Sequence, residues 1–257
     1  MKKYKAILWD LDGTLWDLNG NTTIALKQLF QRFESSNFRN ISLEHFLNCY
    51  PKHNERVWAL YREGKIAKEE LRNKRFIDLF DEVKAHYDLD FVDLFATEFL
   101  AVCPRLPHLI EGAREILEET KGNYTHVILT NGFIEVQGFK MAAAEIQHYF
   151  KTVVYSEEAG VRKPHQAIFD LALQRANCAA EEALMIGDDW DADILGARNA
   201  GIDQVFFTAT EKRLAELHSG KSVRHNYVPT FTINTLNELK NILLHGKQQR
   251  NASADKY

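Results

Sequence analysis

The sequence predicts an α/β fold in which a parallel sheet carries a second, all-helical domain as an insertion. Two observations predict the sheet: short apolar runs recur without the alternation of a half-exposed strand, and amphipathic helical patterns separate them. A third observation predicts the insertion, because a long stretch with only helical patterns follows the first apolar run. Strands of this kind are covered by helices on both faces, as in a Rossmann-like core.

Five apolar runs are the predicted strands: Lys5–Trp9, Thr125–Thr130, Thr152–Tyr155, Ala183–Gly187 and Gln204–Phe207. Helical patterns between and after them lie at about Gly112–Glu119, Ile134–Ile146, Gln166–Ala176 and Asp191–Ala200. A last pattern, Thr235–Leu244, predicts a closing helix. The polar tail that follows, Gly246–Tyr257, is expected to be mobile.

The inserted stretch shows apolar residues at helical spacing and no clear strand. Ser42 and Asp90 are the expected helix N-caps there, and Pro104 and Pro107 mark the return to the core. The predicted domains are therefore a core formed by residues 1–18 and 104–245, a helical domain of residues 19–103, and the tail, residues 246–257.

Composition excludes several classes of protein. The chain has 257 residues, 45% of them hydrophobic, which is typical of a globular protein and not of a disordered one. The net charge of −4 argues against a broad nucleic-acid-binding surface, so we expect no nucleic-acid partner. Three scattered cysteines form no disulfide framework, and no apolar run is long enough for a signal peptide or a membrane span. We therefore expect a cytoplasmic protein with no membrane partner.

Four polar motifs follow predicted strands. They are Asp10–Thr14, Thr130–Gly132, Arg162–Pro164 and Gly187–Asp189. Each alone has an ordinary interpretation as a turn, a loop, a solvated charge or a helix cap. Because the carboxyl ends of parallel strands meet at one edge of the sheet, the shared placement instead predicts a functional site at that edge.

The expected edge is crowded with carboxylates: Asp10, Asp12, Asp188, Asp189 and Asp193. Two like charges about 4 Å apart repel by roughly 4 kcal/mol at an effective dielectric constant near 20. A bound cation would relieve this repulsion, and Mg²⁺ is the cation that combines a preference for oxygen ligands with binding of phosphate groups. Lys163 would add a further positive charge.

Asp-x-Asp-Gly-Thr, Thr-Asn-Gly, Lys-Pro and Gly-Asp-Asp-x₃-Asp-Ile, in this order, resemble the phosphatases of the haloacid dehalogenase superfamily. The resemblance covers about residues 4–18 and 104–245, and the insert matches that family's cap domain in position and type. Thr130–Phe133 with Gln137, and Ser156–Val161 followed by Lys163-Pro164, are similar to its pyrimidine 5′-nucleotidase branch.

The resemblance implies a role for each motif residue. Asp10 is similar to the nucleophile that forms an aspartyl-phosphate. Asp12 is similar to the general acid that protonates the leaving oxygen and then acts as the base for water. Lys163 is similar to the cation that stabilises Asp10 and the transferring phosphoryl group.

The remaining roles concern phosphate and metal. The implied phosphate-binding residues are Thr130, Asn131, Gly132 and Lys163. The implied Mg²⁺ ligands are the Asp10 side chain, the Asp12 backbone carbonyl and Asp188, with Asp189 and Asp193 as orienting groups outside them.

These implications define the expected function: a cytoplasmic Mg²⁺-dependent phosphomonoester hydrolase, a 5′-nucleotidase acting on small nucleoside monophosphates. Within enzymes, the alternative is a sugar-phosphate phosphatase or a phosphoglucomutase-like member with the same core residues. A phosphate-accepting receiver domain is disfavoured by the insert and by the acid at Asp12. A catalytically silent binding module is disfavoured because every motif position holds a chemically competent residue.

Overall fold

The computed structural model describes residues 4–208 and 227–244. The chain forms two compact units, of which one comprises Met1–Leu18 and Pro107–Tyr257 and the other Asn19–Leu106. The second unit thus ends three residues after the boundary that the sequence predicted at residue 103. The predicted tail, residues 246–257, lies outside the described residues.

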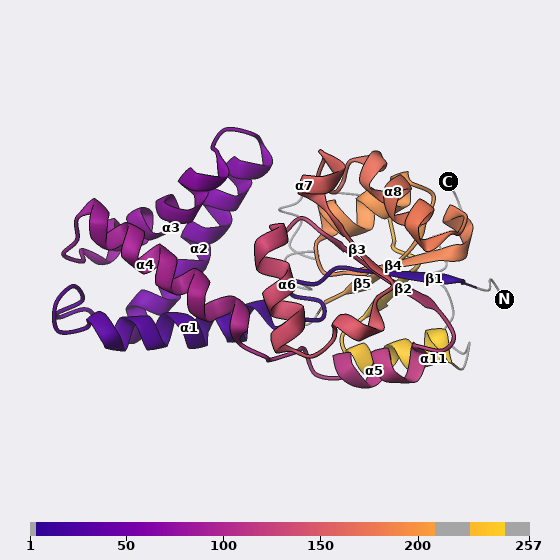
Figure 1. Cartoon of the computed structure of the whole chain (residues 1–257), viewed down its shortest axis with the longest axis horizontal. Helices are drawn as coiled ribbons and strands as arrows, with labels where there is room; N and C mark the ends of the chain where they lie inside the picture. The colour runs from indigo at the N-terminus through magenta and orange to yellow at the C-terminus, as the bar shows by residue number, and fades with distance from the viewer. Residues whose placement is uncertain (1–3, 209–226, 245–257) are drawn as a thin grey trace. The chain divides into compact units, whose positions relative to one another are not determined.

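The first unit is built on a six-stranded parallel sheet with the strand order β3-β2-β1-β4-β5-β6 (Figure 1). The strands are β1 (Ala6–Trp9), β2 (Thr125–Thr130), β3 (Thr152–Tyr155), β4 (Ala183–Gly187), β5 (Asp203–Phe207) and β6 (Phe231–Ile233). The prediction of an α/β fold with a parallel sheet is confirmed. Because β1 lies between β2 and β4, the residues that follow these three strands are neighbours at the carboxyl edge.

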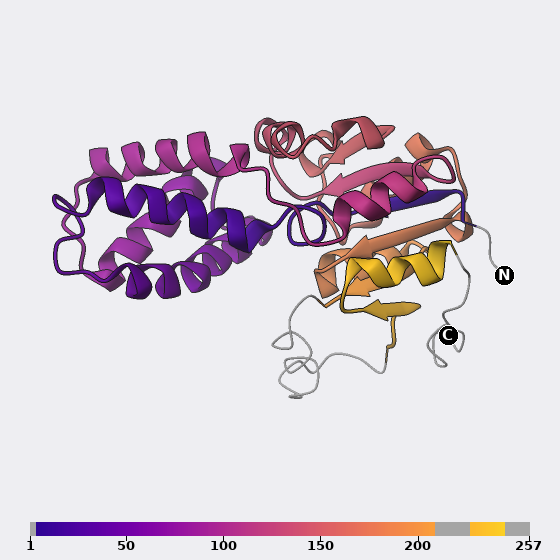
Figure 2. The ribbon, with the colours of Figure 1, turned by 90° about the horizontal axis from the view of Figure 1, so that it is seen from below.

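Helices cover both faces of this sheet. They are α5 (Ala113–Thr120), α6 (Ile134–Ala143), α7 (Ser156–Ala159), α8 (Gln166–Ala176), α9 (Gly196–Asn199) and α11 (Leu239–Leu243), with short turns η2 (Gln147–Tyr149), η3 (Ala180–Glu182), η4 (Trp190–Leu195) and η5 (Leu236–Glu238). Helices α5 and α11 lie together on one face, and α8 lies on the other (Figures 1 and 2). Leu8 and Val127 of the sheet share a buried cluster with Phe169 of α8.

The C-terminal part of the sheet differs from the prediction. Strand β6 is only three residues long, Phe-Thr-Ile, and so short a run gives no strand pattern. The closing helix predicted at Thr235–Leu244 is present in two pieces, the 3₁₀ turn η5 and the short helix α11. The side chain of Glu238 accepts a hydrogen bond from the backbone N–H of Thr235 at 2.9 Å and so caps this segment.

The second unit is helical, and all of its residues are described. It contains α1 (Leu18–Phe33, which begins at the last residue of the first unit), α2 (Leu43–Arg62), α3 (Lys68–Val83), α4 (Leu89–Val102) and the turn η1 (Cys103–Arg105). Its centre is filled by fully buried phenylalanines: Phe30, Phe38, Phe46, Phe76, Phe80 and Phe95. These rings pack against one another in tilted, edge-on and stacked pairs, which is how aromatic side chains pack favourably.

One of the two predicted helix caps in this unit is wrong. Ser42 caps α2 as predicted, because its hydroxyl accepts a hydrogen bond from His45 N at 3.2 Å. Helix α4 is capped by Asp88, which accepts from Phe91 N at 2.8 Å, and Asp90 lies within its first turn. Both aspartates fit the pattern of a cap, and the extended backbone at Asp88 decides between them.

Across the described ranges 4–208 and 227–244, no helix combines the length and apolar character that a membrane crossing requires.

Candidate active site

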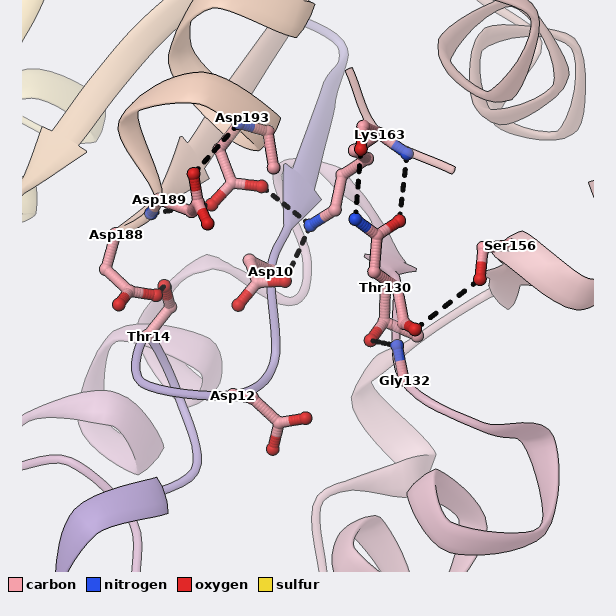
Figure 3. Close-up of polar contacts among 12 residues, drawn as sticks. Asp10, Asp12, Thr14, Thr130, Gly132, Ser156, Lys163, Asp188, Asp189 and Asp193 are labelled. Carbon is pink, nitrogen blue, oxygen red and sulfur yellow. Dashed lines mark hydrogen bonds and ion pairs between the residues drawn. The ribbon is translucent and has the colours of Figure 1, made fainter. Parts of the chain in front are cut away.

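The predicted site residues of the core come together at the carboxyl edge of the sheet (Figure 3). Asp10 follows β1, Thr130 ends β2 and Asp188 follows β4. Lys163 lies between α7 and α8, and its ammonium group reaches the same place. The structure therefore assembles one group of side chains from motifs that are far apart in the sequence.

Lys163 joins two of the aspartates. Its Nζ donates to Asp10 Oδ1 and to Asp193 Oδ1, both at 2.6 Å. All three side chains are buried, and Asp193 is completely so. The second oxygen of Asp193 accepts a hydrogen bond from the backbone N–H of Asp189 at 3.0 Å. Asp193 therefore holds Lys163 in position, with neither of its oxygens left without a donor.

Two glycines make room for these carboxylates. A Cβ on Gly13 would lie 2.7 Å from an Asp188 oxygen, and Gly13 also has a φ of +88°, which favours glycine. A Cβ on Gly187 would overlap the Asp193 carboxylate. Thr14 donates its hydroxyl to Asp188 Oδ1 at 2.9 Å and so fixes one oxygen of that side chain.

Negative charge is in excess here. Oxygens of Asp10, Asp188 and Asp193 all lie within 4.8 Å of one another, and Lys163 is the ammonium paired with two of them. Burial and the two neighbouring carboxylates raise the pKa of Asp10 although Lys163 opposes the change. Burial also raises the pKa of Asp193 to about 6. Burial lowers the pKa of Lys163, but Asp10 and Asp193 outweigh it, so the net change is upward.

This donor set fits a hard divalent cation. It consists only of carboxylate oxygens, and three carboxylates with one ammonium leave two negative charges in excess when all are ionised. Lys163 and Thr14 each engage one oxygen of Asp10 and Asp188, respectively. Asp10 and Asp188 are therefore the carboxylates best placed to bind a cation, because both oxygens of Asp193 already accept hydrogen bonds.

Asp189 has a different task. Its side chain is exposed and accepts from the backbone N–H groups of Asp191 and Ala192, both at 2.9 Å. It thereby caps the π-helical turn η4, which carries Asp193 into the site. Asp189 therefore orients the turn that carries Asp193, and its own side chain lies outside the cluster.

The Thr-Asn-Gly motif builds one hydroxyl donor. Thr130 Oγ1 accepts from Gly132 N and from Gln137 Nε2, both at 2.9 Å, so its own proton remains available for donation. Asn131 exchanges two hydrogen bonds with the backbone of Lys163, at 2.8 and 3.1 Å. Asn131 thus orients the backbone of Lys163, and Gly132 contacts Thr130. The direct contacts of Asn131 and Gly132 with phosphate that the resemblance implies stay a prediction.

Asp12 lies in a second polar group, and its carboxylate points away from that of Asp10 (Figure 3). Its two oxygens accept from Lys140 Nζ at 2.6 Å and from Gln137 Nε2 at 2.8 Å. No sequence motif indicated Lys140. Its spacing of three residues from Gln137 places both on one face of α6, but this spacing does not show that Lys140 is buried.

The fold and the site together define the class of protein. A sequence profile of the haloacid dehalogenase-like hydrolases matches residues 4–201. A parallel sheet with reactive carboxylates beyond β1 and β4 agrees with that match. The chain belongs to the haloacid dehalogenase-like hydrolases.

Individual relatives cover nearly the whole chain. Pyrimidine 5′-nucleotidase YjjG of Escherichia coli is 30% identical over 242 residues, which are 94% of this chain and 98% of YjjG. Glyceraldehyde 3-phosphate phosphatase of Methanothermobacter thermautotrophicus is 28% identical over 93% of this chain and 99% of its own length. The magnesium-bound crystal structure of the HAD-hydrolase YfnB from Bacillus subtilis superposes with a TM-score of 0.77 at 26% identity, covering 94% of this chain and 99% of YfnB.

Proposed function

We propose that this protein is a Mg²⁺-dependent phosphomonoester hydrolase that acts through an aspartyl-phosphate on Asp10. The observation that carries the proposal is the surroundings of Asp10: a buried carboxylate with Lys163 on one oxygen and Asp188 close to it, at the edge where Thr130 offers a hydroxyl proton. Phosphoryl transfer requires mainly positioning and charge neutralisation, which this group of residues supplies.

The reaction follows from the two aspartates. One oxygen of the Asp10 carboxylate attacks phosphorus while Lys163 and the Thr130 hydroxyl stabilise the phosphoryl oxygens. Asp12 gives a proton to the departing alcohol oxygen. It then takes a proton from the water that attacks the aspartyl-phosphate, which releases inorganic phosphate and restores Asp10.

Mg²⁺ would be held by the Asp10 carboxylate, the Asp12 backbone carbonyl and Asp188, and when bound it neutralises charge on the phosphoryl oxygens. Asp193 fixes Lys163, and Asp189 fixes the turn that carries Asp193. These roles assign a task to every acidic residue that the sequence singled out.

An acid at Asp12 favours phosphate esters over haloacids. A halide leaves without a proton and without a metal, whereas an alcohol leaving group needs a proton and a phosphoryl group benefits from a cation. In this proposal residues 1–18 and 104–245 perform the chemistry, and the helical residues 19–103 act as a cap that selects the leaving group. A cytoplasmic location suits a small phosphorylated metabolite as the substrate.

For the substrate, we favour pyrimidine nucleoside monophosphates. The likeness of Thr130–Phe133 and Ser156–Val161 to the nucleotidase branch and the coverage of YjjG support this choice. Glyceraldehyde 3-phosphate phosphatase is also similar over 93% of the chain, and this observation supports a sugar-phosphate phosphatase as the second candidate.

Steady-state kinetics on both substrate classes tests the proposal. With Mg²⁺ present, kcat/KM for dUMP or dTMP should exceed that for hexose phosphates and for glyceraldehyde 3-phosphate by at least about tenfold, or roughly 1.4 kcal/mol of transition-state discrimination. Preference for a sugar phosphate would overturn the nucleotidase assignment and keep the phosphatase. No phosphate release from any of these esters, or from p-nitrophenyl phosphate, would overturn both.

A further inference from the structure

Helix α6 directs two buried side chains at Asp12. Lys140 Nζ donates to Oδ1 at 2.6 Å, and Gln137 Nε2 donates to Oδ2 at 2.8 Å. Lys140 is 6% exposed and Gln137 is 0% exposed. Because each oxygen has its own donor from the same helix, the carboxylate is held in a single orientation.

The position of Lys140 is itself fixed. Its Nζ lies 4.6 Å from the centroid of the Trp16 ring, which is a favourable place for a cation. Trp16 is fully buried, and its carbonyl accepts from Gly13 N at 3.0 Å, which closes the loop that carries Asp12. A buried ammonium group requires an anion, and among the described residues Asp12 is the only carboxylate that pairs with Lys140.

Gln137 connects this pair to the phosphate-binding hydroxyl. The same Nε2 that donates to Asp12 also donates to Thr130 Oγ1 at 2.9 Å. Gly132 leaves space for this arrangement, since a Cβ at that position would overlap the Gln137 amide. One face of α6 therefore orients both the proposed proton-transfer group and the proposed phosphate donor.

We propose that Lys140 is a positioning residue for Asp12, holding Oδ1 throughout the reaction while Oδ2 exchanges Gln137 for the leaving oxygen or water. This inference rests on the proposed function. The two donors differ in strength, because a hydrogen bond from an ammonium group to a carboxylate is stronger than one from a neutral amide. Oδ2 is thus the oxygen that can change partner, and Gln137 keeps its bond to Thr130 when it does.

A double-mutant cycle tests this role. The variants are Lys140→Met, Asp12→Asn and the combination of both. Methionine retains an unbranched side chain over Trp16 and removes only the charged donor. Lys240→Met is the matched control, because Lys240 also forms an ion pair, with Glu119 at 2.7 Å, but lies on α11 and serves no proposed site residue.

Lys140→Met should lower kcat for p-nitrophenyl phosphate and for dUMP by about tenfold or more and change KM by less than about threefold. In the Asp12→Asn background it should cause no further loss, since the group that it positions can no longer transfer a proton. In the Asp12→Asn background, kcat is measured with p-nitrophenyl phosphate, because its leaving group departs without a proton. Lys240→Met should match the wild type.

Three results would overturn the inference. Equal losses from Lys140→Met in the presence and absence of the Asp12 carboxylate would show that Lys140 acts independently of Asp12. A higher KM at constant kcat would show that Lys140 binds substrate directly. Wild-type kcat in Lys140→Met would show that it has no role in turnover.

Thermal unfolding of each variant separates these results from loss of the fold. If Lys140→Met does not fold, Lys140→Arg replaces it in the same cycle. Arginine keeps the positive charge but moves it, so its effect on kcat should again be lost in the Asp12→Asn background. A wild-type protein that releases no phosphate from any ester would instead overturn the proposed function, together with this inference.

Discussion

Asp10 and Asp12 are separated by one residue, and a buried lysine donates to each carboxylate at 2.6 Å. The two groups nevertheless differ in charge. Lys163 is shared between Asp10 and Asp193, with Asp188 beside them, so three carboxylates surround one ammonium group. Within the described part of the chain, Lys140 pairs with Asp12 alone, and the neutral amide of Gln137 is the second donor to that carboxylate.

The difference separates two tasks within one short loop. Around Asp10, burial and the neighbouring carboxylates raise the pKa of that acid. The excess of negative charge favours binding of a divalent cation. Around Asp12 the ion pair is balanced, so the group needs no cation and is built for orientation. Proximity in the sequence therefore says little about the electrostatic role of each aspartate.

Removal of divalent cations should have the largest effect, and it should act on the Asp10 group. We expect an excess of chelator to abolish turnover, Mg²⁺ to restore it and Ca²⁺ to substitute poorly. Mg²⁺ binds in a tight octahedron at about 2.1 Å, whereas Ca²⁺ accepts longer bonds and a bidentate aspartate, which would occupy the attacking oxygen.

The same binding can be measured without turnover. Mg²⁺ should raise the unfolding temperature of the wild type and of Glu119→Gln, a surface control, but not of Asp188→Asn. Full activity in excess chelator, or an equal rise in all three proteins, would contradict the distinction between the two aspartates.

A third buried polar pair consists of Trp9 and His126. Because this pair is uncharged at neutral pH, we expect it to have the smallest effect, which concerns the pH dependence of the free energy of unfolding. Trp9 Nε1 donates to His126 Nδ1 at 2.9 Å. Burial lowers the pKa of His126 below 6.5, against a smaller opposing effect of the Thr120 backbone. The unfolded chain therefore binds this proton more readily, so the free energy of unfolding should fall as the pH decreases below about 6.5, by at most roughly 1.4 kcal/mol per pH unit.

Urea unfolding at about pH 7.5 and about pH 5.5 measures this loss. It should be smaller in His126→Gln than in the wild type, and unchanged in His148→Gln, an exposed control in the same unit. Equal losses in the free energy of unfolding of all three proteins would show that groups other than His126 cause the destabilisation at low pH.

The parts of the fold that sequence analysis predicted are those with a repeated signal. The five predicted strands and the helix Gln166–Ala176 are apolar or periodic over several residues, and they are present. Strand β6 is too short to give a pattern, and the cap of α4 depends on backbone conformation at Asp88. Such details are decided by tertiary packing and local dihedral angles.

The site shows the same division. The motifs at strand ends placed Asp10, Lys163 and Asp188 together because parallel strands end at one edge. Lys140 escaped notice because a lysine within an amphipathic helix is ordinarily solvated, and only the fold shows that it is buried against Trp16. Which oxygen a side chain engages follows from geometry alone.

The central claim is that Asp10 carries the phosphoryl group during turnover. Acid quenching of the enzyme during turnover of p-nitrophenyl phosphate with Mg²⁺, followed by mass spectrometry of its peptides, tests this directly. We predict one added phosphoryl group on Asp10 in the wild type, more of it in Asp12→Asn, where the base for hydrolysis is missing, and none in Asp10→Asn, which should also lose turnover. An active Asp10→Asn enzyme, or turnover with no phosphoryl group on Asp10 in either of the other proteins, would contradict the account.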